Sequence, residues 1–410
     1  LPLLSITIYK LSKVINSRST IVQEMLAKLS SFTQESFSGI SVIKSYTLEN
    51  LMNKDFESLA SKTKLINMNL VKVQAWFFPL MILLIGLSNL IVIFVGGKQY
   101  INDEIEIGVL AEFIVYINML TWPVAVVGWV TSIVQQAEAS QKRINQFLNE
   151  RIEIKNGKGI EKLINGEIIF ENVSIFYPET KIKALDKISF KIKAGEKLGV
   201  IGKVGSGKST LLNLVNRLYD VNDGKVMIDG NNVKDFKLNG LRGLIGNIPQ
   251  NSFLFSESIL DNISFGKIDA TVKEIKGACK VAEIHESIIG FKNGYETLLG
   301  ERGLTLSGGQ IQRVSIARAL IKNPQILLFD DCLSSVDTDT EEKILKNLKR
   351  TCQNKTTIMV SNRISSIKDA DKIIVLEDGK IIEVGDHETL IKNKNYYSEL
   401  FKRQQYEKEF

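Results

Sequence analysis

The stretch Gly202-Lys203-Val204-Gly205-Ser206-Gly207-Lys208-Ser209-Thr210 decides the fold of the larger part of this chain. The apolar residues 198–201 precede it and residues 211–215 follow, so strand, glycine-rich turn and helix come in the order of a phosphate-binding loop. Glycines let the backbone N–H groups of such a turn point inward at an anion. Lys208 can then reach the outer phosphates of a nucleotide, and the Ser209 hydroxyl can bind Mg²⁺ at a helix N-terminus.

Length and charge narrow the class of protein. With 410 residues the chain is too long for one compact core and predicts two or three domains. A net charge of +6 calls for no nucleic-acid partner, and lysine-rich stretches beside apolar runs suit an anionic membrane surface. Cys279, Cys332 and Cys352 have neither CxxC spacing nor a nearby histidine, so we expect reduced, buried thiols in a cytosolic domain.

The N-terminal third of the sequence predicts helices in water and helices in a membrane. Residues 10–72 are polar, follow a helical period and contain no proline, which indicates an amphipathic helical hairpin in water with its turn at residues 38–46. Residues 73–97 carry no charge and are long enough to span a bilayer. A second uncharged run, residues 113–137, is a further candidate span, with a buried soluble helix as the alternative.

Charge predicts the orientation of these spans. Residues 98–112 carry four carboxylates and a single lysine, whereas residues 10–72 are rich in lysine. The lysine-rich hairpin is therefore expected in the cytoplasm. Residues 1–9 are apolar but too short to cross a bilayer, so we read them as the end of a spanning helix that begins earlier. No signal peptide is expected, since no basic region precedes them.

The pattern of the sequence changes after residue 150, where long helical stretches give way to a linker and short strands. Residues 151–166 predict a flexible linker by their glycine, asparagine and lysine content. Beyond them, short apolar strands alternate with helical stretches, which argues for a mainly parallel α/β sheet closed by a hairpin at Asp378-Gly379. The expected strands are residues 167–173, 185–192, 198–201, 326–329, 357–360 and 373–376.

Two further motifs carry chemistry. The buried strand at residues 326–329 ends in Asp330, placed to hold Mg²⁺ through water, and Asp331, placed to orient a nucleophilic water. Leu306-Ser307-Gly308-Gly309-Gln310 opens a helix with free N–H groups and a hydroxyl, which makes a second anion site on the same domain. A single phosphate-loop domain has no use for two such sites unless a second domain shares them.

On these motifs, residues 167–410 resemble the nucleotide-binding domain of an ABC transporter, and the whole chain resembles the C-terminal part of an ABC exporter half-transporter. Tyr177 matches the aromatic that stacks on adenine, a contact of roughly 1–3 kcal/mol. Residues 300–303 resemble the exporter loop that senses the membrane domain. The other matching pieces are the phosphate loop, the Q-loop Ile248-Pro249-Gln250, the signature Leu306 to Gln310, the Asp330 strand and the D-loop Ser334-Ser335-Val336-Asp337.

The resemblance implies a multidomain fold. Residues 1–150 would be all-α transmembrane and intracellular-loop helices: the end of helix four, a loop with a coupling helix at residues 39–46, and helices five and six. Residues 151–166 would be a linker, and residues 167–410 an α/β P-loop NTPase domain with an α-helical subdomain. Helices one to three would be missing, so the complete protein would be longer.

The family's arrangement also implies partners and site residues. Two such subunits close head to tail in a bacterial inner or plasma membrane, with cytoplasmic nucleotide domains and ATP between one phosphate loop and the other signature. Mg²⁺ would be held by Ser209, Gln250 and Asp330, and the catalytic residues would be Asp331, Asn362 and Gln250. The ATP-binding residues would be Tyr177, Gly202, Val204, Gly205, Ser206, Gly207, Lys208, Ser209, Thr210, Ser307, Gly308, Gly309, Gln310, Asp330 and Asp337.

Two positions depart from the family's pattern. Asp331 stands where the family has glutamate, and Asn362 stands where it has the switch histidine. Neither His285 nor His387 lies where it could substitute, and both are expected at the surface. A carboxylate shorter by one methylene is displaced by about 1 Å, which can cost on the order of 10²-fold in rate. This domain is therefore predicted to bind MgATP well and to hydrolyse it poorly.

The signature, by contrast, is intact, which resembles the degenerate-site subunit of heterodimeric exporters. Its Ser307 and Gly309 would serve a competent site with the partner's lysine, glutamate and histidine. The alternative is a slow homodimer in which Asp331 suffices. A soluble ABC-type ATPase or regulator and an importer ATPase are disfavoured by the fused apolar spans, and a gated channel is a further alternative. An amphipathic drug, lipid or peptide substrate is compatible with Trp76, Phe77, Phe78, Asn89, Tyr116, Asn118, Trp122 and Trp129.

Overall fold

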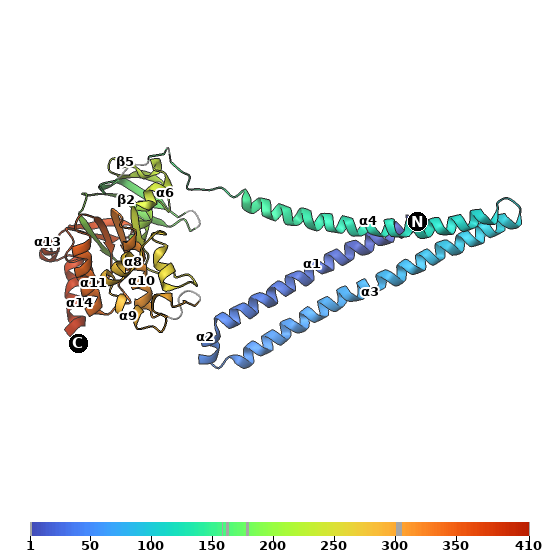
Figure 1. Ribbon diagram of the computed structural model, residues 1–410, viewed down its shortest axis with the longest axis horizontal. Coiled ribbons are helices and arrows are strands. Elements are labelled where there is room, and N and C mark those ends of the chain that lie inside the picture. The colour runs from blue at the N-terminus through green and yellow to red at the C-terminus, as the bar shows by residue number, and fades with distance from the viewer. Residues whose placement is uncertain (1, 158, 161–163, 178–179, 301–305, 410) are drawn as a thin grey trace. The chain divides into compact units, whose positions relative to one another are not determined.

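The computed structural model describes residues 2–157, 159–160, 164–177, 180–300 and 306–409. It divides into two compact units, Leu1–Arg151 and Ile152–Phe410. The first is built of helices alone in its described residues, and the second is an α/β unit (Figure 1). This is the fold class that the sequence predicts.

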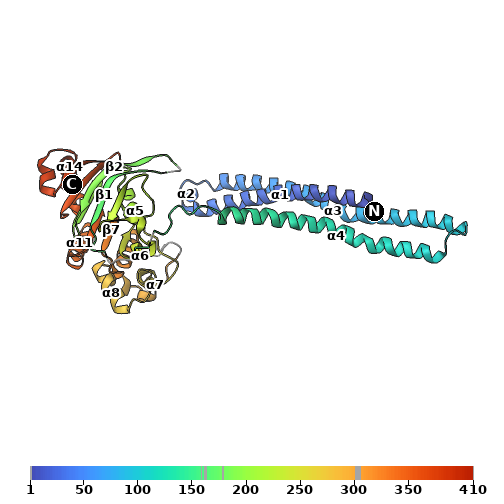
Figure 2. The ribbon, with the colours of Figure 1, turned by 90° about the horizontal axis from the view of Figure 1, so that it is seen from above.

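The first unit is a set of long helices that lie side by side (Figure 2). Its turn falls where the sequence predicts it, because a short helix and its flanking residues separate the first long helix from the second. The Arg18 Nη1 atom donates a hydrogen bond to the Asn69 carbonyl at 2.6 Å and joins the two arms of this hairpin. The elements are α1 (Pro2–Ser38), α2 (Ile40–Ser45), α3 (Glu49–Ile101) and α4 (Ile107–Leu148).

Helix α3 is long and apolar enough to cross a membrane by length and composition. Only 6% of its most apolar 18-residue window is buried, which suits a surface that faces lipid rather than a soluble core. It contains the first predicted span, residues 73–97. The second predicted span lies within α4, whose apolar part among the described residues is Ile107–Leu120. The side chains of Trp122 and Trp129 lie outside the described ones.

The second unit is organised by a six-stranded sheet of order β10-β9-β3-β8-β7-β6. All neighbouring strands are parallel except β10, which pairs antiparallel with β9 through the predicted Asp378-Gly379 turn. Strand β3, which leads into the phosphate loop, is therefore central. The strands are β3 (Lys197–Gly202), β6 (Ile245–Ile248), β7 (Ile326–Asp330), β8 (Thr356–Val360), β9 (Lys372–Glu377) and β10 (Lys380–Gly385).

A second, four-stranded antiparallel sheet of order β2-β1-β4-β5 was not predicted. The sequence marked its first two strands but gave no sign that they pair with each other and with a later strand. Its inner face packs on the large sheet in one core that includes Phe170, Leu185 and Leu198. The strands are β1 (Ile168–Phe176), β2 (Lys183–Ile192), β4 (Asp223–Ile228) and β5 (Asn231–Asn232).

Helices complete the unit. A second core joins α7, α8, α10 and α11 and forms a helical part beside the large sheet. As predicted, Cys279, Cys332 and Cys352 are free and buried. The helices are α5 (Lys208–Val215), α6 (Leu238–Gly243), α7 (Ile259–Ser264), α8 (Val272–Val281), α9 (His285–Ile289), α10 (Gly308–Ile321), α11 (Thr338–Thr351), α12 (Ile364–Ile367), α13 (His387–Lys392) and α14 (Tyr396–Glu409), with 3₁₀ turns η1 (Val233–Asp235) and η2 (Gly294–Glu296).

The segment expected to be a flexible linker is attached to the α/β unit over much of its described length. The Leu238 N–H donates to Asn156 Oδ1 at 3.1 Å, and the Gly157 N–H donates to the Phe236 carbonyl at 3.1 Å. Farther along, the Asp229 carboxylate accepts hydrogen bonds from the N–H groups of three successive residues, 165–167. The groups that hold this segment lie far from it in the sequence. Its own composition gives no sign of them, and so it predicts a mobile linker.

Candidate active site

The phosphate loop runs from the end of β3 to the start of α5 and has the predicted strand–turn–helix form. Gly207 precedes the helix with φ +95°, and a Cβ atom there would lie 2.3 Å from the Ala184 carbonyl oxygen. Only glycine fits such a position, since both the left-handed backbone and the close approach exclude a side chain. Val204 stands at the exposed tip of the loop, beside Gly205.

Two polar side chains of this loop are suited to an anion. The Lys208 ammonium donates to the carbonyls of Gly202 at 2.7 Å and Lys203 at 2.8 Å, and its burial lowers its pKa. The Ser206 hydroxyl is buried and has no hydrogen-bond partner among the described residues. A buried cation bonded only to neutral carbonyls and an unpartnered hydroxyl fit a nucleotide phosphate.

Oxygen atoms suited to Mg²⁺ lie beside the loop. The Ser209 hydroxyl donates to Asp330 Oδ1 at 2.9 Å, and Asp330 is the last residue of β7. Burial raises the pKa of the Asp330 carboxyl, and the bond from Ser209 opposes that shift. The exposed Gln250 follows β6, the neighbouring strand. A serine, a carboxylate and an amide are the hard oxygen ligands that Mg²⁺ takes together with substrate phosphates.

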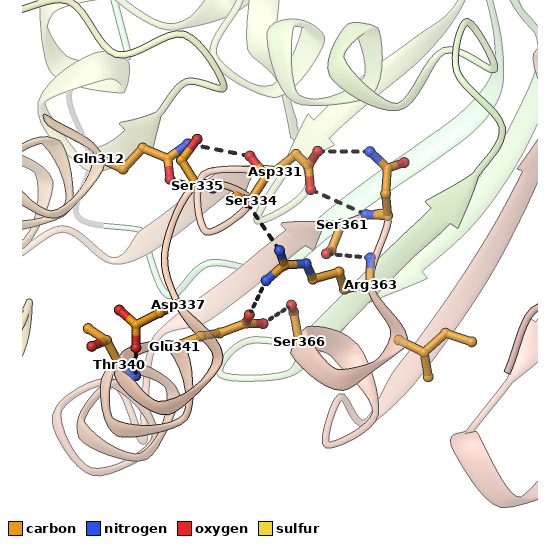
Figure 3. Close-up of polar contacts among 12 residues, drawn as sticks. Gln312, Asp331, Ser334, Ser335, Asp337, Thr340, Glu341, Ser361, Arg363 and Ser366 are labelled. Carbon is orange, nitrogen blue, oxygen red and sulfur yellow. Dashed lines mark hydrogen bonds and ion pairs between the residues drawn. The ribbon is translucent and has the colours of Figure 1, made fainter. Parts of the chain in front are cut away.

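The two departures from the family pattern contact each other. The side-chain amide of Asn362 donates to Asp331 Oδ2 at 2.8 Å, and the Asn362 backbone N–H donates to Asp331 Oδ1 at 3.3 Å. The Asp331 backbone is held as well, with φ +44° and its N–H bonded to the Val360 carbonyl at 2.9 Å. Both carboxylate oxygens therefore point at the segment that follows β8 (Figure 3).

Behind these residues lies a network that the sequence did not predict. The Arg363 guanidinium donates to Glu341 Oε2 at 2.8 Å and to the Ser334 carbonyl at 3.1 Å. The Ser366 hydroxyl donates to the other oxygen of Glu341, a side chain that is 2% exposed (Figure 3). The network ties the segment after β8, the D-loop and helix α11 together. The bonded residues lie more than twenty positions apart in the sequence, so no local pattern marks them as partners.

Replacing Glu341 by alanine is expected to destabilise the α/β unit by about 2 kcal/mol, because Arg363 and Ser366 lose their shared acceptor. The cost stays below that of a fully buried pair, since the Arg363 side chain is 42% exposed. Thermal unfolding of the full chain should show a midpoint lower by about 5 °C. Glu342→Ala, at the exposed neighbouring position, is the matched control. Equal midpoints for the two variants would contradict this role.

The signature lies at the start of α10. Ser307 and Gln310 form a capping box, in which each side chain bonds the other's backbone N–H. A Cβ atom on Gly309 would lie 2.8 Å from the Ser335 carbonyl oxygen, whereas one on Gly308 would make an ordinary contact with the Ser335 side chain. Gln312 also accepts a hydrogen bond from the Ser335 N–H at 3.1 Å. The signature and the D-loop are thus packed together.

The remaining predicted residues lie at the edges of the site. The Tyr177 hydroxyl is 3.0 Å from Thr210 Oγ1, and its ring stands at 90° to that of Tyr219 with centroids 5.1 Å apart. Asp337 caps α11 and accepts a hydrogen bond from the Thr340 N–H at 2.9 Å, which lowers the pKa of the Asp337 carboxyl. Of the predicted loop at residues 300–303, residues 301–303 lie outside the described ones.

Both histidines differ from the surface positions expected of them. Each is half-buried, and its Nδ1 atom lies 2.8 Å from the hydroxyl of a tyrosine ten residues later: His285 from Tyr295 and His387 from Tyr397. Each therefore has a structural partner within the fold. The sequence does place a tyrosine ten positions after each histidine, but such a spacing carries no general meaning.

Comparison with known proteins covers both units. Residues 1–124 match the family described as ABC transporter transmembrane region, and residues 185–334 match the family described as ABC transporter. The Multidrug resistance-like ATP-binding protein MdlA of Buchnera aphidicola (subsp. Schizaphis graminum) is 38% identical over 410 residues, which are 100% of this chain and 71% of that protein. The ATP-dependent lipid A-core flippase of Desulfotalea psychrophila is 36% identical over 98% of this chain and 71% of its own length.

Among solved structures, one titled as a bacterial Atm1-family ABC exporter with ATP bound has a TM-score of 0.87 and 29% sequence identity. The match covers 98% of this chain and 72% of that chain. The likeness therefore runs through the helical unit as well as the α/β unit.

Proposed function

The chain belongs to the ABC transporters, as an exporter with a transmembrane region and a nucleotide-binding domain, and we propose that it is the slow-hydrolysing subunit of a heterodimer. Membership makes it a membrane protein that binds ATP and couples ATP hydrolysis to transport, with its nucleotide-binding domain in the cytoplasm. ABC exporters work as dimers, so a second subunit completes each site. In the proposed heterodimer this chain is the slow-hydrolysing subunit and the second subunit is the faster one.

The residues of this chain divide into two groups by what they would hold. The phosphate loop, with Lys208 and Ser206, would bind the ATP phosphates, and Tyr177 would bind the base. Ser209, Asp330 and Gln250 would hold Mg²⁺, which when bound neutralises charge on the phosphate oxygens. Asp337 and the signature residues Ser307 to Gln310 would complete a site whose phosphate loop comes from the partner.

The observation that carries the proposal is the contact between Asp331 and Asn362. An attacking water is activated by a carboxylate that reaches it, and Asp331 is one methylene shorter than glutamate. Its two oxygens accept hydrogen bonds from the N–H and the amide of Asn362, which hold the short carboxylate in place. An asparagine amide, unlike an imidazole, cannot hold or release a proton near neutral pH. This arrangement supports tight binding and slow hydrolysis at the chain's own site.

The transported substrate is proposed as an amphipathic molecule of the drug, lipid or peptide class. Two relatives are named for multidrug resistance and for lipid A-core flipping. Many apolar side chains of α3 are exposed, among them Leu83, Leu90 and Phe94, and they would face lipid or an amphipathic substrate. These observations support a class of substrate rather than one compound.

The heterodimer is tested by comparing two changes in the transporter co-assembled with its partner. Asp331→Ala in this chain is expected to lower the steady-state ATPase rate by less than about twofold. The glutamate-to-glutamine change in the partner should lower it by about 100-fold or more, because the partner's site supplies the turnover. If Asp331→Ala alone removes most of the activity, the slow homodimer is the correct description.

A further inference from the structure

The C-terminal helix α14 holds the segment that follows β8, residues 361–364, which we call the switch segment. The Gln404 side chain of α14 makes two hydrogen bonds to its backbone. Its Oε1 accepts from the Ile364 N–H at 2.9 Å, and its Nε2 donates to the Asn362 carbonyl at 2.7 Å. One carboxamide thus pairs with a donor and an acceptor two residues apart, and this fixes both the segment and the amide's own orientation.

The first of these bonds completes helix α12. Ile364 is the first residue of α12, and Arg363 before it makes no side-chain cap. The N–H groups at a helix start need partners from outside the helix. Gln404 supplies one of them from forty residues farther along the chain, so the start of α12 depends on the placement of α14.

Helix α14 is itself held firmly in the fold, so it can fix the position of the switch segment. Tyr397 is fully buried, its N–H donates to Glu383 Oε1 at 3.0 Å, and its hydroxyl lies 2.8 Å from His387 Nδ1. The same core includes Ile201, the residue before Gly202 at the start of the phosphate loop, and Ile364 of the switch segment. The helix therefore packs on the two parts of the chain that approach the nucleotide.

A second contact joins the same helix to the phosphate loop. The Lys203 ammonium lies 5.8 Å from the centroid of the Tyr396 ring and 2.6 Å from Glu377 Oε1. The first turn of α14 thus contacts the loop, and its third turn contacts the switch segment. Both contacts come from one helix, α14.

The chain of hydrogen bonds runs onward to the reacting centre. Gln404 bonds the carbonyl of Asn362, and Asn362 bonds both oxygens of Asp331 through its N–H and its side chain. From the opposite side, Arg363 ties the segment to the Ser334 carbonyl. The position of Asn362 is therefore fixed by the hydrogen bonds of Gln404 and Arg363 as well as by its own rotamer preference.

We propose that Gln404 is a positioning residue for ATP hydrolysis, through which the C-terminal helix sets where Asn362 holds the Asp331 carboxylate. The proposal rests on the roles proposed above for Asp331 and Asn362. Gln404 contacts the backbone of the switch segment and reaches the Asp331 carboxylate only through Asn362. It fixes the backbone from which the Asn362 side chain reaches the carboxylate, so its loss should slow hydrolysis while leaving ATP binding nearly unchanged.

The test uses the full chain purified alone, where every site contains Asp331 and Asn362. Gln404→Ala should lower kcat for ATP hydrolysis by about tenfold with KM within twofold, since the phosphate loop still binds the nucleotide. Gln404→Glu keeps an acceptor for the Ile364 N–H but sets an oxygen against the Asn362 carbonyl, and should lower kcat at least as much. Gln405→Ala, at the exposed neighbouring position, is the matched control and should change neither.

Hydrogen–deuterium exchange gives a readout that needs no turnover. Exchange in a peptide covering residues 361–366 should rise by about tenfold in Gln404→Ala and stay unchanged in Gln405→Ala. Gln404→Ala should cost less kcat in an Asn362→Ala background than in the unmodified chain, because the Asn362 side chain through which part of the effect passes is already absent. Normal kcat in Gln404→Glu, additive losses, or unchanged exchange in Gln404→Ala would each overturn the proposal.

These outcomes are independent of the heterodimer. Fast turnover by the unmodified chain on its own would contradict the slow-subunit proposal, whereas the role of Gln404 is read from ratios between variants and that chain. If the unmodified chain turns over fast and Gln404→Ala lowers its kcat tenfold, the positioning role stands and the slow site is discarded. If the unmodified chain is slow and Gln404→Ala leaves its kcat unchanged, the slow site stands and the positioning role is discarded.

Discussion

Changing Asp331 to glutamate and Asn362 to histidine together should raise the ATPase rate of the chain purified alone by on the order of 100-fold. Glutamate restores the methylene that carries the carboxylate toward the nucleotide. Histidine replaces the amide that donates to Asp331 Oδ2 at 2.8 Å with an imidazole, which can also hold and release a proton near neutral pH. The measurement is kcat at saturating MgATP.

The single changes should gain far less than the double one. Asp331→Glu alone leaves an amide where the imidazole would act, and Asn362→His alone leaves the carboxylate short. Groups that act as a unit are strongly non-additive, so a gain confined to the double variant is the signature of this explanation. A gain below about threefold in a variant that folds normally would show that neither the methylene nor the imidazole limits the rate.

Gly309→Ala should remove about 99% of the ATPase activity of the transporter assembled with its partner. A Cβ atom there would lie 2.8 Å from the Ser335 carbonyl oxygen, which is backbone and cannot move aside. The start of α10 and the D-loop would have to separate, and a displacement of about 1 Å can cost on the order of 10²-fold. In the proposed heterodimer the loss would arise at the partner's site, which the signature of this chain would complete.

Gly277→Ala provides the control for Gly309→Ala. Gly277 lies in α8 with nothing within 4 Å of a Cβ atom, so alanine fits without strain. ATP affinity at this chain's own phosphate loop should be unchanged in both variants. If Gly309→Ala retains more than half of the activity, then either the D-loop yields at Ser335 or the signature does not serve the faster site.

The sequence predicted those parts of the site that short stretches of chain determine. The phosphate loop needs glycine at residue 207 for its backbone, and Asp330 follows from its place at the end of an apolar strand. Both properties are local, so periodicity and turn chemistry reveal them. The predicted turn at residues 38–46 and the Asp378-Gly379 hairpin are of the same kind, and both are present.

The unpredicted parts depend on contacts between distant residues. The antiparallel sheet needs β1 to pair with β4 across about fifty residues, and the Asp229 carboxylate bonds backbone more than sixty residues earlier. Arg363 and Gln404 are ordinary surface types by composition, and only the fold brings them to the switch segment. No local pattern distinguishes such residues from solvated ones.

Hydrogen bonds between residues 156–157 and 165–167 and the rest of the α/β unit limit how much free chain remains between the two units. Helix α4 ends at Leu148, and the N–H groups of Asn149 and Glu150 still bond to carbonyls of its last turn. Hydrogen bonds to the rest of the α/β unit begin at Asn156, which leaves the five residues 151–155 as a joint. Five residues reach at most about 18 Å when fully extended. If the nucleotide-binding domain moves farther than these five residues can extend, the end of α4 must move with it.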